Sequence, residues 1–348
     1  MQNTMWRTVL TAPGQFEQQQ VPVPMPGPGE VLLQVTHIGV CGSDISAFYN
    51  RHPYIHCPIV LGHEFAGVVA AVGSNVQAPA PGTRISVIPH LVCGVCPACR
   101  QAQYNLCNAL RCIGAQADGG HAEFVIVPAG MAISIPDAMS LEDAALVEPA
   151  AVGYHGIKRA HIQPDDRVLI VGAGPIGNFT MQSARVLGAK AVYIADIASD
   201  RLALAASLGA DGIIDLSTET LADGITRLVD GPEAITVYAD CVGGRGDVLN
   251  LLIATATRGS RLAVIGVLGN NYHLPLLPDF IEHELTLYGT TMYVPQDYRD
   301  VIAHLAAGRI RTAGMVSHHY RMNEIPDAFA MIDGKKEAFF KIVFTDVK

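Results

Sequence analysis

Short apolar runs separated by Pro- and Gly-rich turns dominate the first 150 or so residues of the chain. The runs 31–38, 65–72, 84–88 and 122–127 each have the length and composition of a strand. The segment 21–30 (VPVPMPGPGE) is too rich in Pro and Gly to hold a helix. Strands at this spacing, with turn signals between them, predict a β-barrel or a β-sandwich.

The pattern changes after about residue 150, where strand-like runs alternate with helical ones. Six strands separated by helices are typical of an α/β fold with a doubly wound parallel sheet. The last ~55 residues return to a mixed pattern. The predicted strands are 167–171, 191–196, 212–214, 236–240, 261–267 and 285–288, and two of the predicted helices are 176–187 and 201–208.

Composition and charge exclude several classes of protein. A chain of 348 residues has room for about two domains. Its 50% hydrophobic content excludes intrinsic disorder, and no run approaches the ~18 apolar residues of a membrane span. The net charge of −9 argues against a nucleic-acid surface, which needs clustered cations. The amino terminus lacks the basic and apolar regions of a secretory signal, so we expect a cytoplasmic protein.

A glycine-rich turn connects a predicted strand to a predicted helix. The run 168–171 leads directly into Gly172-Ala173-Gly174-Pro175-Ile176-Gly177. In this context the spacing predicts a dinucleotide site: Gly172 permits the turn, Gly174 lets the backbone approach the pyrophosphate, and Gly177 lets helix and strand pack closely. The helix amino terminus, with Pro175 and Ile176, would receive the phosphates. The alternative is a glycine turn without a ligand.

Asp196 lies 24 residues after Gly172, at the end of the next predicted strand. Its carboxylate can accept hydrogen bonds from ribose hydroxyls and would repel a 2′-phosphate, which favours NAD over NADP. Arg201 is close enough in sequence to flank the adenine, or to counter a 2′-phosphate if Asp196 turns away. We also expect Ile265 and Val267, at the end of strand 261–267, to border the cofactor.

Four of the eight cysteines lie within fifteen residues, in the order Cys93-x2-Cys96-x2-Cys99-x7-Cys107. One loop with this spacing can surround a tetrahedral ion, and four thiolates make a closed structural zinc site. The alternatives are an iron–sulfur cluster or four free thiols. The remaining single cysteines Cys57, Cys112 and Cys241 are interpreted as small core residues, whereas Cys41 belongs to a different pattern.

Cys41 follows a predicted strand, His63 precedes another, and Glu148 lies just before the predicted dinucleotide domain. One thiolate, one imidazole and one carboxylate, with a fourth position left for water or substrate, is the ligand set of a catalytic zinc. Each residue alone is more commonly structural. The hypothesis rests on their joint presence in a chain that also carries a dinucleotide site.

These motifs resemble those of the zinc-dependent medium-chain dehydrogenase/reductase family, in its sorbitol dehydrogenase-like branch. The resemblance covers essentially the whole chain, and alcohol dehydrogenases proper carry a Cys at the position of Glu148. The matching segments are GVCGSD (39–44), GHEFAG (62–67), CGVCPACRQAQYNLC (93–107), DGGHAEF (118–124), VEPAAVGYHG (147–156) and VLIVGAGPIG (168–177).

The resemblance implies a GroES-like β-barrel catalytic domain and a Rossmann domain with a cleft between them. We assign residues 1–151 to the catalytic domain, with a zinc lobe at about 90–112, residues 152–290 to the Rossmann domain, and 291–348 to a return to the catalytic domain. It further implies two zinc ions per chain, NAD as cofactor, and a homodimer or homotetramer.

Carried over to this chain, the resemblance makes Cys41 and His63 ligands of a catalytic zinc, with Glu64 and Glu148 both placed at the metal and able to exchange with water. The zinc would lower the pKa of a substrate hydroxyl, whose proton Ser43 would pass outward. Asp44 would fix the tautomer of His63.

One position departs from the family pattern. Many relatives have a His five residues after the zinc-binding Cys, where this chain has Ser46. The proton would therefore leave through Ser46, water, the cofactor ribose or a loop group such as His52.

We therefore expect an oxidoreductase that transfers hydride between NAD(H) and a secondary alcohol of a polyol or sugar acid. Arg51 and His52, on a polar and aromatic loop, could anchor a carboxylate or phosphate, or could form a solvated loop tip. Alternatives for the substrate are a sugar phosphate, as in galactitol-1-phosphate dehydrogenases, or a threonine- or butanediol-type alcohol. A metal-free reductase of the superfamily and a dinucleotide-binding protein without turnover are less consistent with the metal set.

Overall fold

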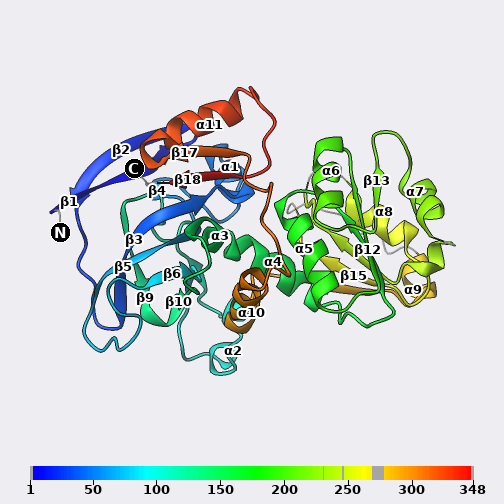
Figure 1. Cartoon of the computed structure of the whole chain (residues 1–348), viewed down its shortest axis with the longest axis horizontal. Helices are drawn as coiled ribbons and strands as arrows, with labels where there is room; N and C mark the ends of the chain where they lie inside the picture. Colours follow the sequence, from blue (N-terminus) through cyan, green and yellow to red (C-terminus); the bar gives the residue numbers. More distant parts are fainter. Residues whose placement is uncertain (1–2, 230, 245–246, 269–277, 346–348) are drawn as a thin grey trace. The chain divides into compact units, whose positions relative to one another are not determined.

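Strand β3 (Glu30–Gly39) is the central strand of the amino-terminal part of the molecule (Figure 1). In this computed structural model, which describes residues 3–229, 231–244, 247–268 and 278–345, β3 pairs antiparallel with three strands. Its neighbours are β5 (Glu64–Val72), β9 (Phe124–Pro128) and β18 (Ile342–Thr345). Contacts between residues divide the chain into two compact units. The first combines residues 1–148 with 294–306 and 312–348.

The first unit contains two main sheets. The larger has the order β10-β6-β5-β3-β18-β17, with β9 also on β3, and the smaller has the order β2-β1-β4. The other elements of this unit are β1 (Thr4–Ala12), β2 (Gln15–Pro22), α1 (Gly42–Phe48), β4 (Ile59–Val60), β6 (Arg84–Val87), β7 (His90–Leu91), α2 (Pro97–Arg100), β8 (Arg111–Cys112), β10 (Ala132–Ser134), α3 (Leu141–Ala145), α10 (Pro295–Ala306), β17 (His318–Arg321) and α11 (Ile325–Asp333). The described part of this unit also contains the short 3-10 helices η1 (Tyr104–Leu106), η2 (Ala129–Met131) and η4 (Met322–Glu324), and the second unit contains η3 (Pro232–Ala234).

The alternation of side chains along β3 explains why this strand is central. Val31, Leu33 and Val35 are each at most 1% exposed and face one core. Leu32, between them, packs into a second hydrophobic cluster on the other face. Apolar side chains of β3 therefore pack on both faces of the sheet, whereas Gln34 is exposed.

The four strands predicted in this half are all present, with small differences at their ends. The predicted run 122–127 begins later, at Phe124, because Ala122 forms an isolated bridge with Arg7 of β1 instead. The segment therefore contacts the small sheet before it joins the large one.

The second unit, residues 149–293 and 307–311, is built on a six-stranded parallel sheet flanked by helices (Figure 1). The strand order β13-β12-β11-β14-β15-β16 is that of a Rossmann fold, and it confirms the predicted fold class. The elements are α4 (Val147–Lys158), β11 (Arg167–Val171), α5 (Pro175–Val186), β12 (Ala191–Asp196), α6 (Ser199–Ser207), β13 (Gly212–Asp215), α7 (Leu221–Leu228), β14 (Val237–Asp240), α8 (Val248–Thr255), β15 (Arg261–Val264), α9 (Pro278–Glu282) and β16 (Thr286–Gly289). Helix α4 begins in the first unit and continues into the second.

Strand β15 is shorter than predicted, ending at Val264 rather than Val267. The N–H groups of Ile265 and Gly266 both donate to the carbonyl of Asp240, at 3.0 and 2.9 Å, so the chain turns there. Among the described residues, no helix combines the length and the apolar character needed to cross a bilayer.

Candidate functional site

The turn after β3 and the start of β5 bring three metal-binding groups together. Cys41 is the residue before helix α1, and His63 and Glu64 lie where β5 begins. The Cys41 sulfur, one His63 ring nitrogen and one Glu64 carboxylate oxygen all lie within 4.8 Å of one another. A thiolate, an imidazole and a carboxylate in this arrangement suit a zinc ion that keeps one position open.

Two residues of helix α1 lie beside the two nitrogens of the His63 ring. Its Nε2 lies 3.5 Å from the Ser43 hydroxyl, and its Nδ1 lies 3.7 Å from Asp44 Oδ1. The other oxygen of Asp44 accepts the N–H of Cys41 at 2.9 Å. This fully buried carboxylate therefore connects the two ligand-bearing segments, and it faces the ring nitrogen opposite to the one that Ser43 approaches.

The electrostatics of the site favour positive charge at His63. Burial by itself would lower the pKa of His63, but the neighbouring Cys41 and Asp44 raise it well above the ordinary value. Burial raises the pKa of Asp44, and His63 opposes that rise. Anionic groups gathered in a dry site attract either a proton or a metal ion, and the donor set fits zinc.

Lys341 is a residue of this site that the sequence analysis missed. Its ammonium forms an ion pair with Glu64, with side-chain exposures of only 5% and 1%. Burial would lower the pKa of Lys341, but Glu64 and Cys41 raise it overall. Gly39 leaves room for the pair, because a Cβ there would lie 3.1 Å from the Lys341 side chain. Lys341 directly precedes β18, a strand that no periodic pattern predicted.

The structure distinguishes the two carboxylates expected at the metal. Glu64 belongs to the compact group with Cys41 and His63, whereas Glu148, the second residue of α4, does not. Glu148 is buried and contributes to the raised pKa of Lys341, so it lies in the same electrostatic neighbourhood. Cys112 is also buried nearby, and burial raises its pKa to about 12.

The four clustered cysteines form a second group of ligand atoms within 4.8 Å of one another. The sulfur of Cys93 lies 3.9 Å from that of Cys99 and 3.6 Å from that of Cys107. A tetrahedral ion with Zn–S bonds of ~2.3 Å requires sulfur separations of about 3.8 Å. The N–H groups of Cys93 and Ala109 both donate to the Cys107 sulfur and help to lower its pKa. The geometry therefore fits a closed structural zinc site.

The glycine-rich turn has the features expected for a dinucleotide. Gly172 has a φ of +101°, and a Cβ at Gly177 would collide with the Gly172 carbonyl. Helix α5 begins at Pro175 with Gly174 before it, so the helix amino terminus opens from the turn. A Cβ at Gly174 would have only the Arg201 guanidinium within 4 Å, at 3.8 Å. The turn is thus tight where it packs and open where a phosphate would approach.

Asp196 is fixed at the edge of this turn. Its Oδ2 accepts the N–H of Ala173 at 2.6 Å and its Oδ1 accepts the N–H of Ala198 at 2.9 Å. Ile265 packs against Gly156 of α4, and Val267 is 73% exposed beside the loop that contains Gly243. The positions expected to contact the cofactor therefore lie at the carboxyl ends of the strands, where Rossmann folds bind ligands.

The two expected substrate anchors are both held by neighbouring residues. The Arg51 guanidinium lies 4.9 Å from the centre of the Tyr49 ring, and the Tyr49 hydroxyl donates to Asp333 at 2.8 Å. His52 Nδ1 accepts the N–H of Tyr54 at 3.2 Å. Burial, followed by the influence of His63, lowers the pKa of His52. In the neutral ring the proton therefore sits on Nε2, which makes His52 a donor rather than a proton acceptor.

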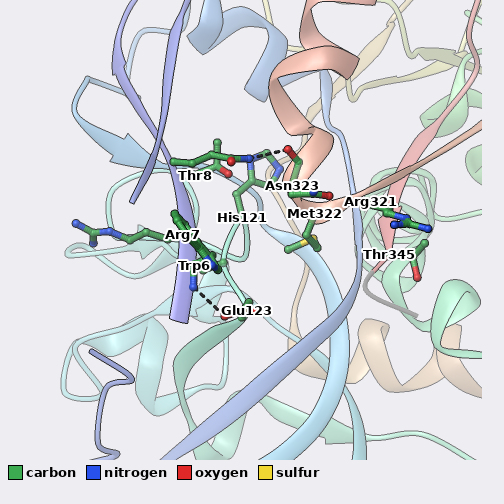
Figure 2. Close-up of a pocket in the computed structure, with 11 residues that line it drawn as sticks. Trp6, Arg7, Thr8, His121, Glu123, Arg321, Met322, Asn323 and Thr345 are labelled. Atoms are coloured by element: carbon green, nitrogen blue, oxygen red, sulfur yellow. Dashed lines mark hydrogen bonds between the residues drawn. The ribbon is translucent and has the colours of Figure 1, made fainter. Parts of the chain in front are cut away.

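A cavity of about 620 Å³ lies elsewhere in the first unit, between β1 and η4 (Figure 2). Trp6 and Glu123 lie on one side of it, joined by a hydrogen bond, and Arg321 and Asn323 lie on the other. None of the site residues predicted from the sequence lines it. His121, which does line it, is 1% exposed, and burial lowers its pKa to about 3.

Comparison with known families agrees with the two units. The sequence matches the alcohol dehydrogenase GroES-like domain over residues 27–137 and the zinc-binding dehydrogenase family over residues 175–307. It is 32% identical to sorbitol dehydrogenase of Bacillus subtilis, with 89% of this chain and 88% of that protein covered. It is 33% identical to L-idonate 5-dehydrogenase of Vitis vinifera (88% and 86% covered), and 34% identical to D-arabitol-phosphate dehydrogenase of Enterococcus avium (94% of each).

Solved structures show the same fold with a nicotinamide cofactor. A zinc-binding dehydrogenase of Sinorhizobium meliloti bound to NADP has a TM-score of 0.90 and 30% identity, covering 99% of this chain and 100% of that one. A protein of Escherichia coli CFT073 described as a short chain alcohol dehydrogenase, complexed with NADH, has a TM-score of 0.90 and 28% identity, with 99% and 100% covered. The chain therefore belongs to the zinc-dependent medium-chain dehydrogenase/reductase family, in its sorbitol dehydrogenase-like branch, and is a zinc enzyme that oxidises alcohols with a nicotinamide cofactor.

Proposed function

We propose that this enzyme oxidises a secondary hydroxyl of a polyol or sugar acid with NAD, at a catalytic zinc held by Cys41, His63 and Glu64. The observation that carries the proposal is the compact group formed by these three ligand atoms. Three protein ligands leave one position of a tetrahedral ion for a substrate oxygen, which is the arrangement of catalytic rather than structural zinc. The four cysteines at 93–107 would hold the second, structural ion.

Each residue around the ligands has a role in the proposed reaction. Bound zinc supplies a Lewis acid that lowers the pKa of the substrate hydroxyl. Ser43, 3.5 Å from His63 Nε2, is placed to accept a hydrogen bond from that hydroxyl and to pass its proton outward. Asp44 Oδ1 lies 3.7 Å from His63 Nδ1, and its negative charge favours the tautomer that carries the proton on Nδ1 and leaves Nε2 free to bind the metal.

The exit route of the proton lacks the histidine that many relatives have five residues after the zinc-binding cysteine. Ser46 takes that position, and its carbonyl accepts the N–H of Arg51 at 2.7 Å. Because His52 Nδ1 is already occupied by the Tyr54 N–H, His52 is better suited to donate to the substrate than to receive its proton. We therefore assign the exit route to the Ser46 hydroxyl, water and the cofactor ribose.

The cofactor preference follows from Asp196. Two backbone N–H groups fix its carboxylate, and each oxygen keeps a further lone pair for a ribose hydroxyl. A 2′-phosphate would meet this fixed negative charge, so we assign NAD as the preferred cofactor. Relatives of similar fold bind NADP or NADH, and the assignment therefore rests on this residue.

Arg51 and His52 favour a substrate with a polar or anionic far end. The guanidinium stacks on Tyr49 and keeps its N–H groups for a carboxylate or phosphate, and the His52 Nε2–H is a second donor. A sugar phosphate is the second candidate substrate, because the similarity to D-arabitol-phosphate dehydrogenase is as strong as that to the polyol enzymes. A threonine- or butanediol-type alcohol is the third, and no contact among the described residues favours it.

The test is a panel of neutral polyols, sugar acids, sugar phosphates and simple secondary alcohols. NADH formation would be followed with the enzyme loaded with zinc. We expect turnover of a polyol or sugar acid with NAD, and its loss in Cys41→Ser and His63→Ala enzymes whose structural zinc is retained. Turnover that survives both substitutions would refute the metal site.

A further inference from the structure

The turn that carries His63 is enclosed by the segment 114–121. The reaction described above gives this segment no role. Gly62, the residue before His63, has a φ of +94°, so the turn needs glycine there. The imidazole of His121 lies against it: a Cβ at Gly62 would be 2.7 Å from His121 Cδ2 and 3.1 Å from Nε2.

A short ladder of backbone hydrogen bonds attaches the same segment to the turn. Three successive N–H groups donate to the three residues before His63: Gly119 to Val60 at 2.8 Å, His121 to Leu61 at 3.0 Å, and Gly120 to Gly62 at 2.9 Å. The Val60 N–H in turn donates to Asp118 at 3.1 Å. These hydrogen bonds fix the position of the turn relative to the segment 114–121.

Two glycines allow this close approach. A Cβ at Gly119 would lie within 3.0 Å of the carbonyl oxygens of Leu61 and Gly62, and a Cβ at Gly114 would lie 2.9 Å from the His63 nitrogen. These obstacles are backbone atoms, which cannot rotate away as a side chain can. Any larger residue would push the His63 turn out of its place.

His121 contributes to this contact through its shape. Within the described residues neither ring nitrogen has a hydrogen-bond partner, although the side chain is 1% exposed. The ring packs edge-on against Phe344, with centroids 5.5 Å apart. A buried imidazole that makes no hydrogen bond costs free energy, so its flat ring must be what the site uses.

We propose that Gly114, Gly119 and His121 form a clamp that positions His63 for metal binding. The clamp rests on the proposed function, because His63 needs this placement only if it is a metal ligand. The backbone at Gly114 and Gly119 lies against the backbone of residues 61–63, and the His121 ring lies against Gly62. The three are positioning residues, and their effect should appear in the geometry and affinity of the catalytic metal.

The experiment replaces the catalytic zinc by Co²⁺, whose visible absorption reports the ligand geometry. The dissociation constant for Co²⁺ would be measured by competition with a chelator, with the structural zinc retained. Gly119→Ala is compared with Gly120→Ala, because the atoms nearest to a Cβ at Gly120 belong to the side chains of Ile38 and Phe65, at 2.8 and 3.0 Å, and not to the backbone of the turn. His121→Ala is compared with His121→Phe, which restores a flat ring.

We expect Gly119→Ala and His121→Ala to weaken Co²⁺ binding at least ~10-fold and to shift its absorption, as loss of residues that orient metal ligands commonly does. Gly120→Ala and His121→Phe should remain within about threefold of the wild type. Equal effects of Gly119→Ala and Gly120→Ala, or wild-type binding by His121→Ala, would overturn the clamp. If Gly119→Ala does not fold, the His121 pair decides the question alone. A wild-type protein that takes up no metal beyond the structural ion would overturn the proposed function and the clamp together.

Discussion

Lys341 and Glu64 form an ion pair in which both side chains are almost completely shielded from water, with exposures of 5% and 1%. Lys341 directly precedes β18, and Glu64 begins β5, so the pair joins the carboxyl-terminal return of the chain to the metal-binding turn. Neither charge would be tolerated here alone. The pair makes the placement of a candidate metal ligand depend on a residue 277 positions away in the sequence.

Replacing Lys341 by Met should therefore destabilise the protein by about 3–5 kcal/mol, because it leaves the Glu64 charge buried without its partner. The free energy of unfolding would be measured in urea after removal of the catalytic ion. The double variant Lys341→Met/Glu64→Gln is the control and should recover much of the loss. A single variant as stable as the wild type would show that the pair is not needed to stabilise the buried carboxylate.

The two metal groups should release their ions under different conditions. The four cysteines enclose an ion completely, whereas Cys41, His63 and Glu64 leave one position open to a competing ligand. Mild chelation should remove one zinc ion per chain together with the activity, while the fold is retained. Metal analysis and circular dichroism would be recorded together. Loss of both ions in parallel with unfolding would contradict the distinction.

Asp196→Ala should weaken NAD binding and reduce the discrimination against NADP. The ratio of kcat/KM for the two cofactors is the measurement. Because the carboxylate also accepts the N–H groups of Ala173 and Ala198, the variant should lose ~1–3 kcal/mol of stability as well. Asp196→Asn is the control, since it keeps one acceptor and removes the charge. A wild type that uses NADP more efficiently than NAD would show the assignment to be wrong.

His90 gives a prediction for the dependence of stability on pH. Burial lowers its pKa to about 4, from an ordinary value of about 6.5 in the unfolded chain. Between these values the unfolded state binds the proton and the folded state does not, so stability falls as the pH is lowered from about 6.5 toward 4. Over this pH range, the neutral His90 changes the free energy of unfolding by up to about 3 kcal/mol. His90→Phe should reduce the slope of unfolding free energy against pH in that range. An unchanged slope would contradict the lowered pKa.

The parts of the fold that depend on local sequence could be predicted. Strands 167–171 and 191–196 have the predicted ends, because a buried parallel strand is a continuous apolar run followed by a turn. The turn at Gly172 to Gly177 was found for the same reason, since its spacing reflects backbone geometry within six residues. The two groups of metal-binding residues were likewise visible as motifs.

Features that depend on distant pairing could not be predicted. Lys341 belongs to the site only because β18 pairs with β3, and a lysine beside an apolar run is usually on the surface. The different positions of Glu64 and Glu148 also needed the structure, because both follow from motifs and only Glu64 lies in the compact group with Cys41 and His63. His121 lies in the matching segment 118–124, but the motif gave it no role, since its contact with Gly62 arises from packing between separate segments.

The contact between Arg51 and Tyr49 gives a test of the substrate class. Because the guanidinium is held over the ring at 4.9 Å, it is partly ordered before any ligand binds. Arg51→Ala should raise KM for a sugar acid or sugar phosphate about 10-fold or more, and change KM for the matching neutral polyol much less. Tyr49→Phe is the control: it removes the hydrogen bond to Asp333 but keeps the aromatic face, so it should affect both substrates equally and weakly. Equal small effects of Arg51→Ala on both substrates would assign Arg51 to a solvated loop. The neutral polyol would then remain as the substrate, because a site without an anion-binding residue gains no affinity from a charged far end.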